Sequence, residues 1–255
     1  MELDLEAILS RSLLIGVRLG SLLVFAPFFS NTAVSPRIKA GLTIILTALL
    51  YPVYPALPLP LGWPAWLSLM SSEFLVGLMM GLTLQFIFDG LRLAGQLAGF
   101  QLGFSLANLI DPQSQVDTPV LSVFHQSIAL LIFLQFDVHH WLLRGMGKSF
   151  EYLPPGTAVA SLGVTEELLR LAGGMFVIAL QVAAPVLLAT MITDVALGFL
   201  GKASPQLPIL FVGLSIKSLV GFTVLMGTVA YWPNVLERHF LGGIQSLERV
   251  LHLAQ

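Results

Sequence analysis

The sequence predicts an all-α membrane protein with about six to eight apolar helices, arranged as two stacked helical hairpins with kinked or broken helices. Hydrophobic residues make up 56% of the 255 residues and charged residues only 10%, whereas a soluble domain has about 25% charged residues. The mean hydropathy is +0.88. Two stretches, from Lys39 to Glu73 and from Arg170 to Asp194, hold no charged residue between their ends, and each is long enough for a membrane-spanning helix of roughly 20 residues.

Prolines and capping residues divide the chain into these helices. Ser35-Pro36, Thr118-Pro119 and Ser204-Pro205 each place a capping side chain before a proline, a pattern that predicts a helix start. A proline-rich connector at 52–64 cannot be helical throughout. The expected helices cover about 7–29, 36–51, 65–109 with a hinge at Asp89-Gly90, 119–136, 165–200, 206–231, and a last helix after a break at Trp232-Pro233.

Glycines at every fourth position predict close packing between helices. Gly95, Gly99 and Gly103 stack on one helix face, where the missing side chains let another backbone approach. The same packing role is expected of four further glycines, Gly16, Gly20, Gly77 and Gly81.

The segment that follows, from Phe104 to Thr118, mixes large apolar and polar residues, and Pro112 and Pro119 deny it a continuous helix. Irregular backbone at membrane depth is tolerated only where protein buries it or where it lines a watery cavity. Apolar side chains in a wet lumen can close it by dewetting, so the segment fits a pore plug; a simple re-entrant or extramembrane loop is the alternative. The expected plug residues are Phe104, Ser105, Leu106, Asn108, Leu109, Ile110, Asp111 and Pro112.

Charged residues also occur within or beside the apolar runs, namely Glu73, Asp89, Arg92, Asp194, Lys202 and Lys217. Asp194 and Lys202 flank a predicted bend at 197–201 and could pair across it, either as a structural bridge or as part of an ion path. In the last helix Leu236, Phe240, Ile244, Leu247 and Leu251 share one face, which predicts an amphipathic helix on a membrane surface or on a partner.

Enzyme and cofactor chemistry finds no support in the sequence. The chain has no cysteine, which excludes disulfides and cysteine nucleophiles. His139-His140 lacks the spacing of a zinc-protease helix, and no phosphate-binding loop occurs, so no catalytic residue, metal or cofactor is expected.

A net charge of −2 gives no basic stripe for nucleic acid. The acidic N-terminus has no basic region before its apolar run, so no cleavable signal is expected.

Several motifs resemble one known family. In order along about residues 11–232, the chain resembles the R subunits of the flagellar type III protein export gate, with the injectisome counterparts less close. The motifs that carry this resemblance are Arg18 before Ala26-Pro27, Pro36–Lys39, Glu73–Gly77 with Gly81, Ala94–Pro112 with Pro119, Asp194–Gly198 and Lys202–Gln206.

The resemblance implies a single-copy subunit that joins several copies of two smaller partners, the P-type and Q-type subunits, and other membrane proteins of the export apparatus. It implies a place in the bacterial inner membrane, at the flagellar basal body, partly raised above the membrane plane and in contact with lipid. Unfolded export substrates would pass once the plug moves. Asp194, Lys202, Pro205 and Gln206 would then stabilise the second hairpin or contact a Q-type neighbour.

Because this family resembles its two smaller partners fused, the resemblance also implies two domains. Residues 1–153 would form a P-like half with the glycine-stepped helix and the plug, and residues 154–255 a Q-like hairpin with the amphipathic last helix. Composition alone leaves one alternative, a multi-pass secondary transporter of a small solute, because broken helices and buried charge would fit it too. A transporter should work alone or as a homodimer, whereas a gate subunit should need unlike partners.

Overall fold

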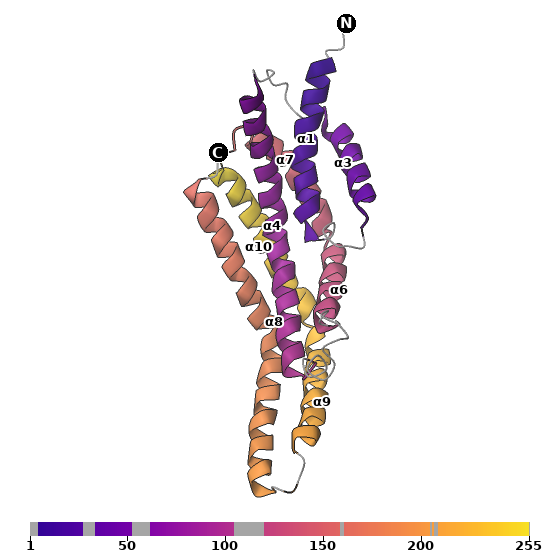
Figure 1. The fold of residues 1–255 in the computed structure, drawn as a ribbon, viewed down its shortest axis with the longest axis vertical. Helices are drawn as coiled ribbons and strands as arrows, with labels where there is room; N and C mark the ends of the chain where they lie inside the picture. Colours follow the sequence, from indigo (N-terminus) through magenta and orange to yellow (C-terminus); the bar gives the residue numbers. More distant parts are fainter. Residues whose placement is uncertain are drawn as a thin grey trace. The chain divides into compact units, whose positions relative to one another are not determined.

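A computed structural model describes residues 5–27, 34–52, 62–104, 120–158, 161–204, 206 and 209–254. Within these residues the regular structure is entirely α-helical, which confirms the predicted class and the number of helices. The eight helices are α1 (Leu5–Phe25), α3 (Pro36–Leu50), α4 (Trp63–Gln101), α6 (Val120–Gln135), α7 (Val138–Tyr152), α8 (Leu162–Ala203), α9 (Ile209–Val229) and α10 (Trp232–Leu253) (Figure 1).

Four of the described helices are long and apolar enough to cross a membrane, namely α1, α4, α8 and α9. The pair α6 and α7 is bent by 66° and could form a fifth, broken span. The bend falls at Asp137, whose backbone adopts a left-handed conformation with φ 53°. Asparagine and aspartate tolerate this conformation better than most residues.

Three helices differ from the sequence prediction. The sequence analysis assigns no helix to 138–152, where α7 lies. α4 runs unbroken through Asp89-Gly90, where a hinge is predicted, because Gly90 serves close packing against the carbonyl of Met175 and the side chain of Ile178. α8 likewise continues through 197–201, where a bend is predicted. Residues 53–61 of the proline-rich connector lie outside the described residues, and so does the predicted helix start at Thr118-Pro119.

The tertiary contacts divide the chain into two compact units. The first contains residues 1–86, 133–172 and 240–255, and the second contains 87–132 and 173–239. The helices α4, α6, α8 and α10 each supply residues to both units. The division into residues 1–153 and 154–255 stays a prediction.

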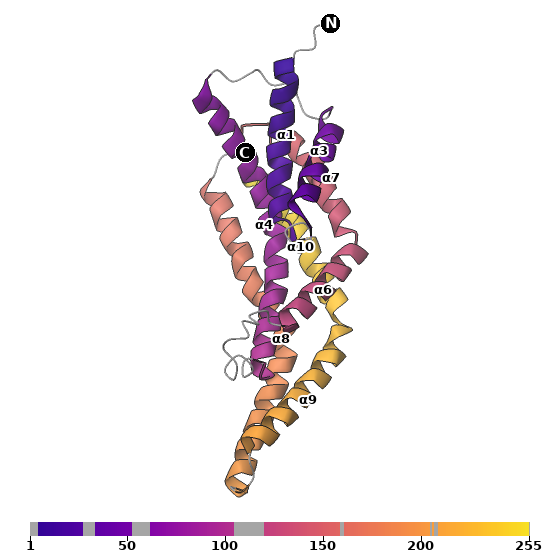
Figure 2. The same cartoon turned by 45° about the vertical axis from the view of Figure 1, so that its right-hand side comes forward.

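In the first unit, α1 packs against both α3 and α4. α3 lies alongside α1 and buries none of its own side chains (Figure 2). A Cβ at Gly77 of α4 would overlap the Arg18 carbonyl and Ser21 Oγ of α1, and a Cβ at Gly81 would lie 2.7 Å from Phe25 Cβ. Contacts at Gly16 and Gly20 are looser, since their nearest neighbours would be 3.6 and 3.9 Å from a Cβ.

The apolar face of α10 is covered by the chain itself. Leu236, Phe240, Leu247 and Leu251 are buried and Ile244 is half-buried. The prediction that this face lies on a membrane surface or a partner is therefore wrong. The amphipathic pattern requires that the face be covered, and the protein's own interior covers it.

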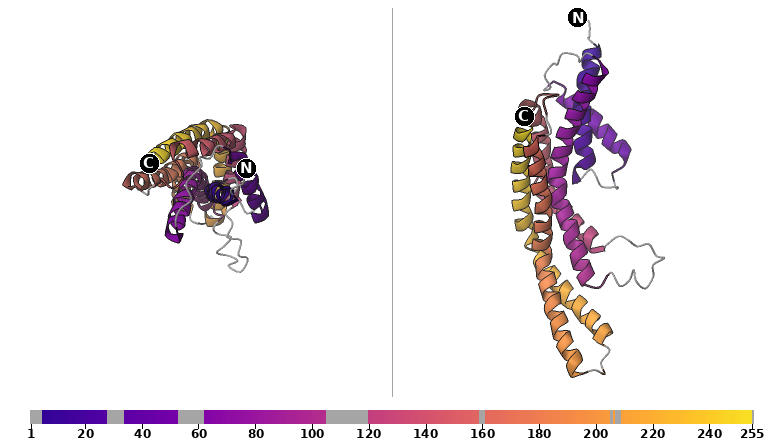
Figure 3. Two further views of the ribbon diagram at one scale, coloured as in Figure 1. Left: turned by 90° about the horizontal axis from the view of Figure 1, so that it is seen from above. Right: turned by 60° about the vertical axis from the view of Figure 1, so that its left-hand side comes forward.

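In the second unit, the C-terminal half of α8 and the helix α9 lie side by side (Figure 3). α4 packs closely on α6, because a Cβ at Gly95 would lie 2.6 Å from the Cα of Ser122. Gly99 is looser, with Leu121 Cδ1 3.8 Å from the position of a Cβ. The C-terminal end of α4 lies beside α9, because a Cβ at Gly221 of α9 would overlap the side chain of Leu102.

Candidate functional site

The candidate site is the C-terminal end of α4, where the chain enters the predicted plug. Phe104 is the one predicted plug residue that lies within the described part of the chain, and its side chain is 41% exposed. The others lie outside the described residues: Ser105, Leu106, Asn108, Leu109, Ile110, Asp111 and Pro112.

A glycine cap ends α4 here. The N–H of Phe104 donates to the carbonyl of Gly99 at 3.1 Å, and the N–H of Gly103 donates to the carbonyl of Phe100 at 3.2 Å. Gly103 has φ +88°, a conformation that costs glycine little and other residues more. This hydrogen-bonding pattern is that of a Schellman-type helix end. Gly103, predicted to pack helices, thus stands at the turn that ends the helix.

Polar side chains of α9 hold this helix end. The Lys217 ammonium donates to Gln101 Oε1 at 3.3 Å and to Asp194 Oδ2 of α8 at 2.6 Å. Ser218 Oγ donates to the carbonyl of Leu102 at 2.9 Å. The last carbonyls of a helix have no partner within the helix, so Ser218 satisfies one of them.

Apolar contacts complete the attachment. The rings of Phe104 and Phe222 meet edge to face, with centroids 5.9 Å apart. Gly221 makes room for Leu102, since a Cβ there would overlap the leucine side chain. Lys217, Ser218, Gly221 and Phe222 occupy one side of α9, because residues four apart lie one turn apart. We call these four residues the α9 anchor.

The predicted pairing of Asp194 with Lys202 is wrong, because Asp194 pairs with Lys217. Both Asp194 and Lys202 lie on the uninterrupted helix α8, eight residues apart. At 1.5 Å per residue that separation is about 12 Å. Lys202 is exposed. Of the other two predicted contact residues, Gln206 is exposed and Pro205 lies outside the described residues.

Most residues of the α9 anchor were not predicted from the sequence. Lys217 was identified as a cation in an apolar run but was given no partner, and Gln101, Ser218 and Phe222 were not singled out. One signal was available, because a cation within an apolar helix normally pairs with an acidic group.

A second polar cluster lies in the core of the first unit. Arg18 of α1 and Glu73 of α4 form a two-bond ion pair with both side chains fully buried. Arg18 also donates to Ser149 Oγ and to the carbonyl of Leu153, each at 3.1 Å. The backbone N–H of Gly156 donates to Glu73 Oε1 at 3.1 Å. The pair thereby joins α1 and α4 to α7 and to the segment after α7.

Within the described residues, one group of side chains has the spacing of metal ligands. Asp137, His139 and His140 each offer an atom within 4.8 Å of the others. His140 Nδ1 lies 3.0 Å from Asp137 Oδ1. The sequence analysis expects no metal here, and the contact between His140 and Asp137 also satisfies the carboxylate that stands at the bend between α6 and α7.

These features define a polytopic helical membrane protein whose candidate site is an anchored helix end that precedes a polar, proline-broken segment. Residues 9–242 match the family described as bacterial export proteins, family 1. The chain therefore belongs to this family.

The relatives of this chain include proteins described as "Flagellar biosynthetic protein FliR". The protein of Pectobacterium carotovorum subsp. carotovorum is 33% identical over 88% of this chain and 86% of its own length. The protein of Escherichia coli (strain K12) is 32% identical over 82% of this chain and 80% of its own length. The protein of Bacillus subtilis (strain 168) is 31% identical over 94% of each chain. The resemblance to the R subunits of the flagellar export gate, stated from the motifs, is confirmed.

Proposed function

We propose that this chain is the R-type subunit of the flagellar protein export gate in the bacterial inner membrane, present once in each gate. The family match and the names of the relatives support a part in flagellar protein export. The four to five helices that could cross a membrane support a membrane location. In this proposal the chain binds and gates, and carries out no chemical step itself.

The observation that carries the gating role is the attachment of the α4 end to the α9 anchor. A plug must return to one place after each opening, so the chain leading into it needs a fixed base. Lys217 and Ser218 hold Gln101 and Leu102, and Phe222 holds Phe104. Residues 104–112 then close the lumen from this base, and unfolded export substrates pass when the segment moves.

P-type and Q-type subunits are the proposed partners, together with other membrane proteins of the export apparatus. α8 and α9 expose many large apolar side chains, among them Leu188, Ile192, Phe199, Leu219 and Met226. Exposed apolar surface of this extent has to be covered by lipid or by apolar subunits. Partner subunits would also raise part of the assembly above the membrane plane.

Leakage through the assembled gate tests the plug. Phe104→Gly combined with Leu106→Gly should let small ions pass, because glycine removes the apolar side chains that exclude water. Leu67→Gly, which removes an exposed apolar side chain of α4, is the control and should stay closed. If the double variant conducts no more than the control does, residues 104–112 are not the plug.

Native mass spectrometry of the chain co-expressed with its genomic neighbours tests the assembly. One copy bound to several copies of two small apolar proteins is the expected result. A stable monomer or homodimer that recruits no partner would overturn the gate assignment and favour the transporter.

A further inference from the structure

α7 and α10 are amphipathic helices, and neither is by itself among the candidate spans within the described residues. In the first unit they pack against each other along their buried faces. A Cβ added at Gly145 of α7 would lie 3.4 Å from Leu247 Cδ2 of α10. The rings of Tyr152 and His252 have centroids 5.2 Å apart.

A pocket of about 280 Å³ lies between these two helices. Aliphatic side chains of α10 line one wall, namely Ile244, Leu247 and Leu251, and Gly145 lines the other. Leu247 and Leu251 are buried. The parts of these side chains that remain accessible line the pocket, so its floor is apolar.

Two cations stand at this apolar surface. Arg144 and Lys148 are four residues apart on α7, so their side chains share one face. Both are exposed, and within the described part of the chain neither makes a hydrogen bond or an ion pair. Glu248 of α10 is the one acidic residue that lines the pocket, which leaves a net positive charge. An anion could bind here without displacing an existing partner.

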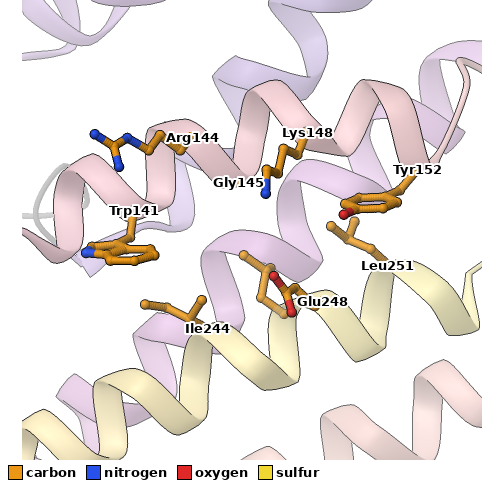
Figure 4. Close-up of a pocket in the computed structure, with 9 residues that line it drawn as sticks. Trp141, Arg144, Gly145, Lys148, Tyr152, Ile244, Glu248 and Leu251 are labelled. Carbon is orange, nitrogen blue, oxygen red and sulfur yellow. The ribbon is translucent and has the colours of Figure 1, made fainter.

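Aromatic side chains mark the two ends of the pocket. Trp141 lies toward one end with Arg144, and Tyr152 lies toward the other with Leu251 (Figure 4). The Trp141 side chain is 50% exposed. Tryptophan and tyrosine concentrate at the headgroup level of membranes, where one side of the ring is apolar and the other is wet.

We propose that this pocket binds an anionic phospholipid. Arg144 and Lys148 would hold the phosphate by charge-assisted hydrogen bonds, and the half-buried Ile244, with the edges of Leu247 and Leu251 that line the pocket, would contact the first methylenes of the acyl chains. The volume suits the headgroup region rather than a whole lipid, so the chains extend beyond the pocket. Basic pockets between helices are known to bind anionic headgroups. This inference does not rest on the gating role.

Tryptophan fluorescence can report on the site directly. The full-length chain, purified in mild detergent with any subunits that accompany it, is titrated with phosphatidylglycerol that carries brominated acyl chains. Bromine quenches nearby indoles, and Trp141→Phe identifies the part of the signal that belongs to Trp141. Phosphatidylcholine with the same chains, and inorganic phosphate as a competitor, distinguish a phospholipid from other ligands.

The expected result is saturable quenching of Trp141, with phosphatidylglycerol bound more tightly than phosphatidylcholine and not displaced by inorganic phosphate. Each basic residue near an anionic lipid surface strengthens binding by roughly fivefold. Arg144→Gln combined with Lys148→Gln should therefore weaken binding by about tenfold or more. The control, Lys202→Gln with Arg238→Gln, removes two exposed cations elsewhere and should leave the affinity unchanged.

Glu248→Gln separates a binding effect from a folding defect. Removing the acidic lining residue should tighten phosphatidylglycerol binding several-fold, which damage to the fold would not do. Equal affinity for the two lipids, or equal affinity in the pocket and control variants, would overturn the proposal. Full displacement by inorganic phosphate would reduce the site to one for small anions, and it would overturn the proposal as well.

Discussion

Arg18 of α1 and Glu73 of α4 face each other inside the first unit, with Arg18 Nε 2.7 Å from Glu73 Oε2 and Nη2 3.0 Å from Oε1. The guanidinium also lies over the ring of Phe150, 4.3 Å from its centroid. Removing charges from water is costly, and the cost is offset only when the partners and their remaining hydrogen bonds are in place. Ser149, Leu153 and Gly156 supply those bonds.

Glu73→Gln should destabilise the protein strongly, because it leaves the buried Arg18 without a counter-charge. Breaking a buried ion pair from one side costs about 3–5 kcal/mol. The yield of folded protein in membranes and the thermal midpoint of the purified chain should both fall. Arg18→Met combined with Glu73→Leu should recover much of the loss, because neither charge then remains. Arg37→Met changes an exposed residue and is the control; a loss as large as that of Glu73→Gln would contradict this account.

Gly77→Ala tests the close approach of α1 and α4. Its Cβ would overlap the Arg18 carbonyl oxygen, which belongs to the backbone and cannot rotate away. Extra atoms in a packed core typically cost about 1–3 kcal/mol, so the thermal midpoint should fall. In Gly173→Ala of α8 the new methyl meets nothing within 4 Å, and alanine favours a helix interior by roughly 0.5–1 kcal/mol. Equal midpoints for the two variants would show that the helices do not need this contact.

Local signals in the sequence were sufficient for the all-α class and for several helix ends. Ser35 caps α3 by accepting a hydrogen bond from the N–H of Ile38, and Pro36 opens the helix, as the Ser-Pro pattern predicts. α7 was not predicted because it contains no long apolar run. Its buried residues Val138, Leu142, Met146 and Phe150 recur every fourth position among polar ones, the pattern of a helix buried on one face only.

The partners of charged and apolar groups could not be predicted, because they depend on tertiary packing. Arg18 and Glu73 are 55 residues apart in the sequence, and Asp194 and Lys217 are 23 apart. The pattern of α10 specified an apolar face without specifying what covers it. Since the plug residues after Phe104 lie outside the described part of the chain, their role stays a prediction.

His239 should make stability depend on pH. Burial lowers the pKa of this histidine below its ordinary value of 6.5, and its Nε2 lies 3.1 Å from Gln181 Oε1. The folded protein therefore favours the neutral ring, while the unfolded chain takes up a proton near pH 6.5. The contribution of His239 is complete above that pH and is lost as the pH falls through it.

The measurement is the thermal midpoint of the purified protein between pH 8 and pH 5. His239→Gln should show a smaller drop than the unchanged chain, because glutamine does not titrate. His140→Gln, at an exposed histidine, serves as the control for the loss of a ring elsewhere. Identical pH profiles for the unchanged chain and His239→Gln would rule out this histidine as a source of pH dependence.

Lys217→Met should loosen the base of the plug without disturbing the rest of the second unit. Methionine keeps the apolar stem but loses the bonds to Gln101 and Asp194. Because Asp194 is half exposed, solvent screens the pair and the loss should be only about 1 kcal/mol. A change of that size alters a two-state population by about fivefold. Ion leakage through the assembled gate should rise by about that factor.

Lys202→Met is the matched control, since it removes an exposed cation of α8 that does not pair with Asp194. Its leakage should equal that of the unchanged gate. Asp194→Asn should leak as Lys217→Met does, and the double variant should leak little more than either single one, because the two changes break the same contact. Additive effects, or equal leakage from Lys217→Met and Lys202→Met, would show that the α9 anchor does not set the position of the plug.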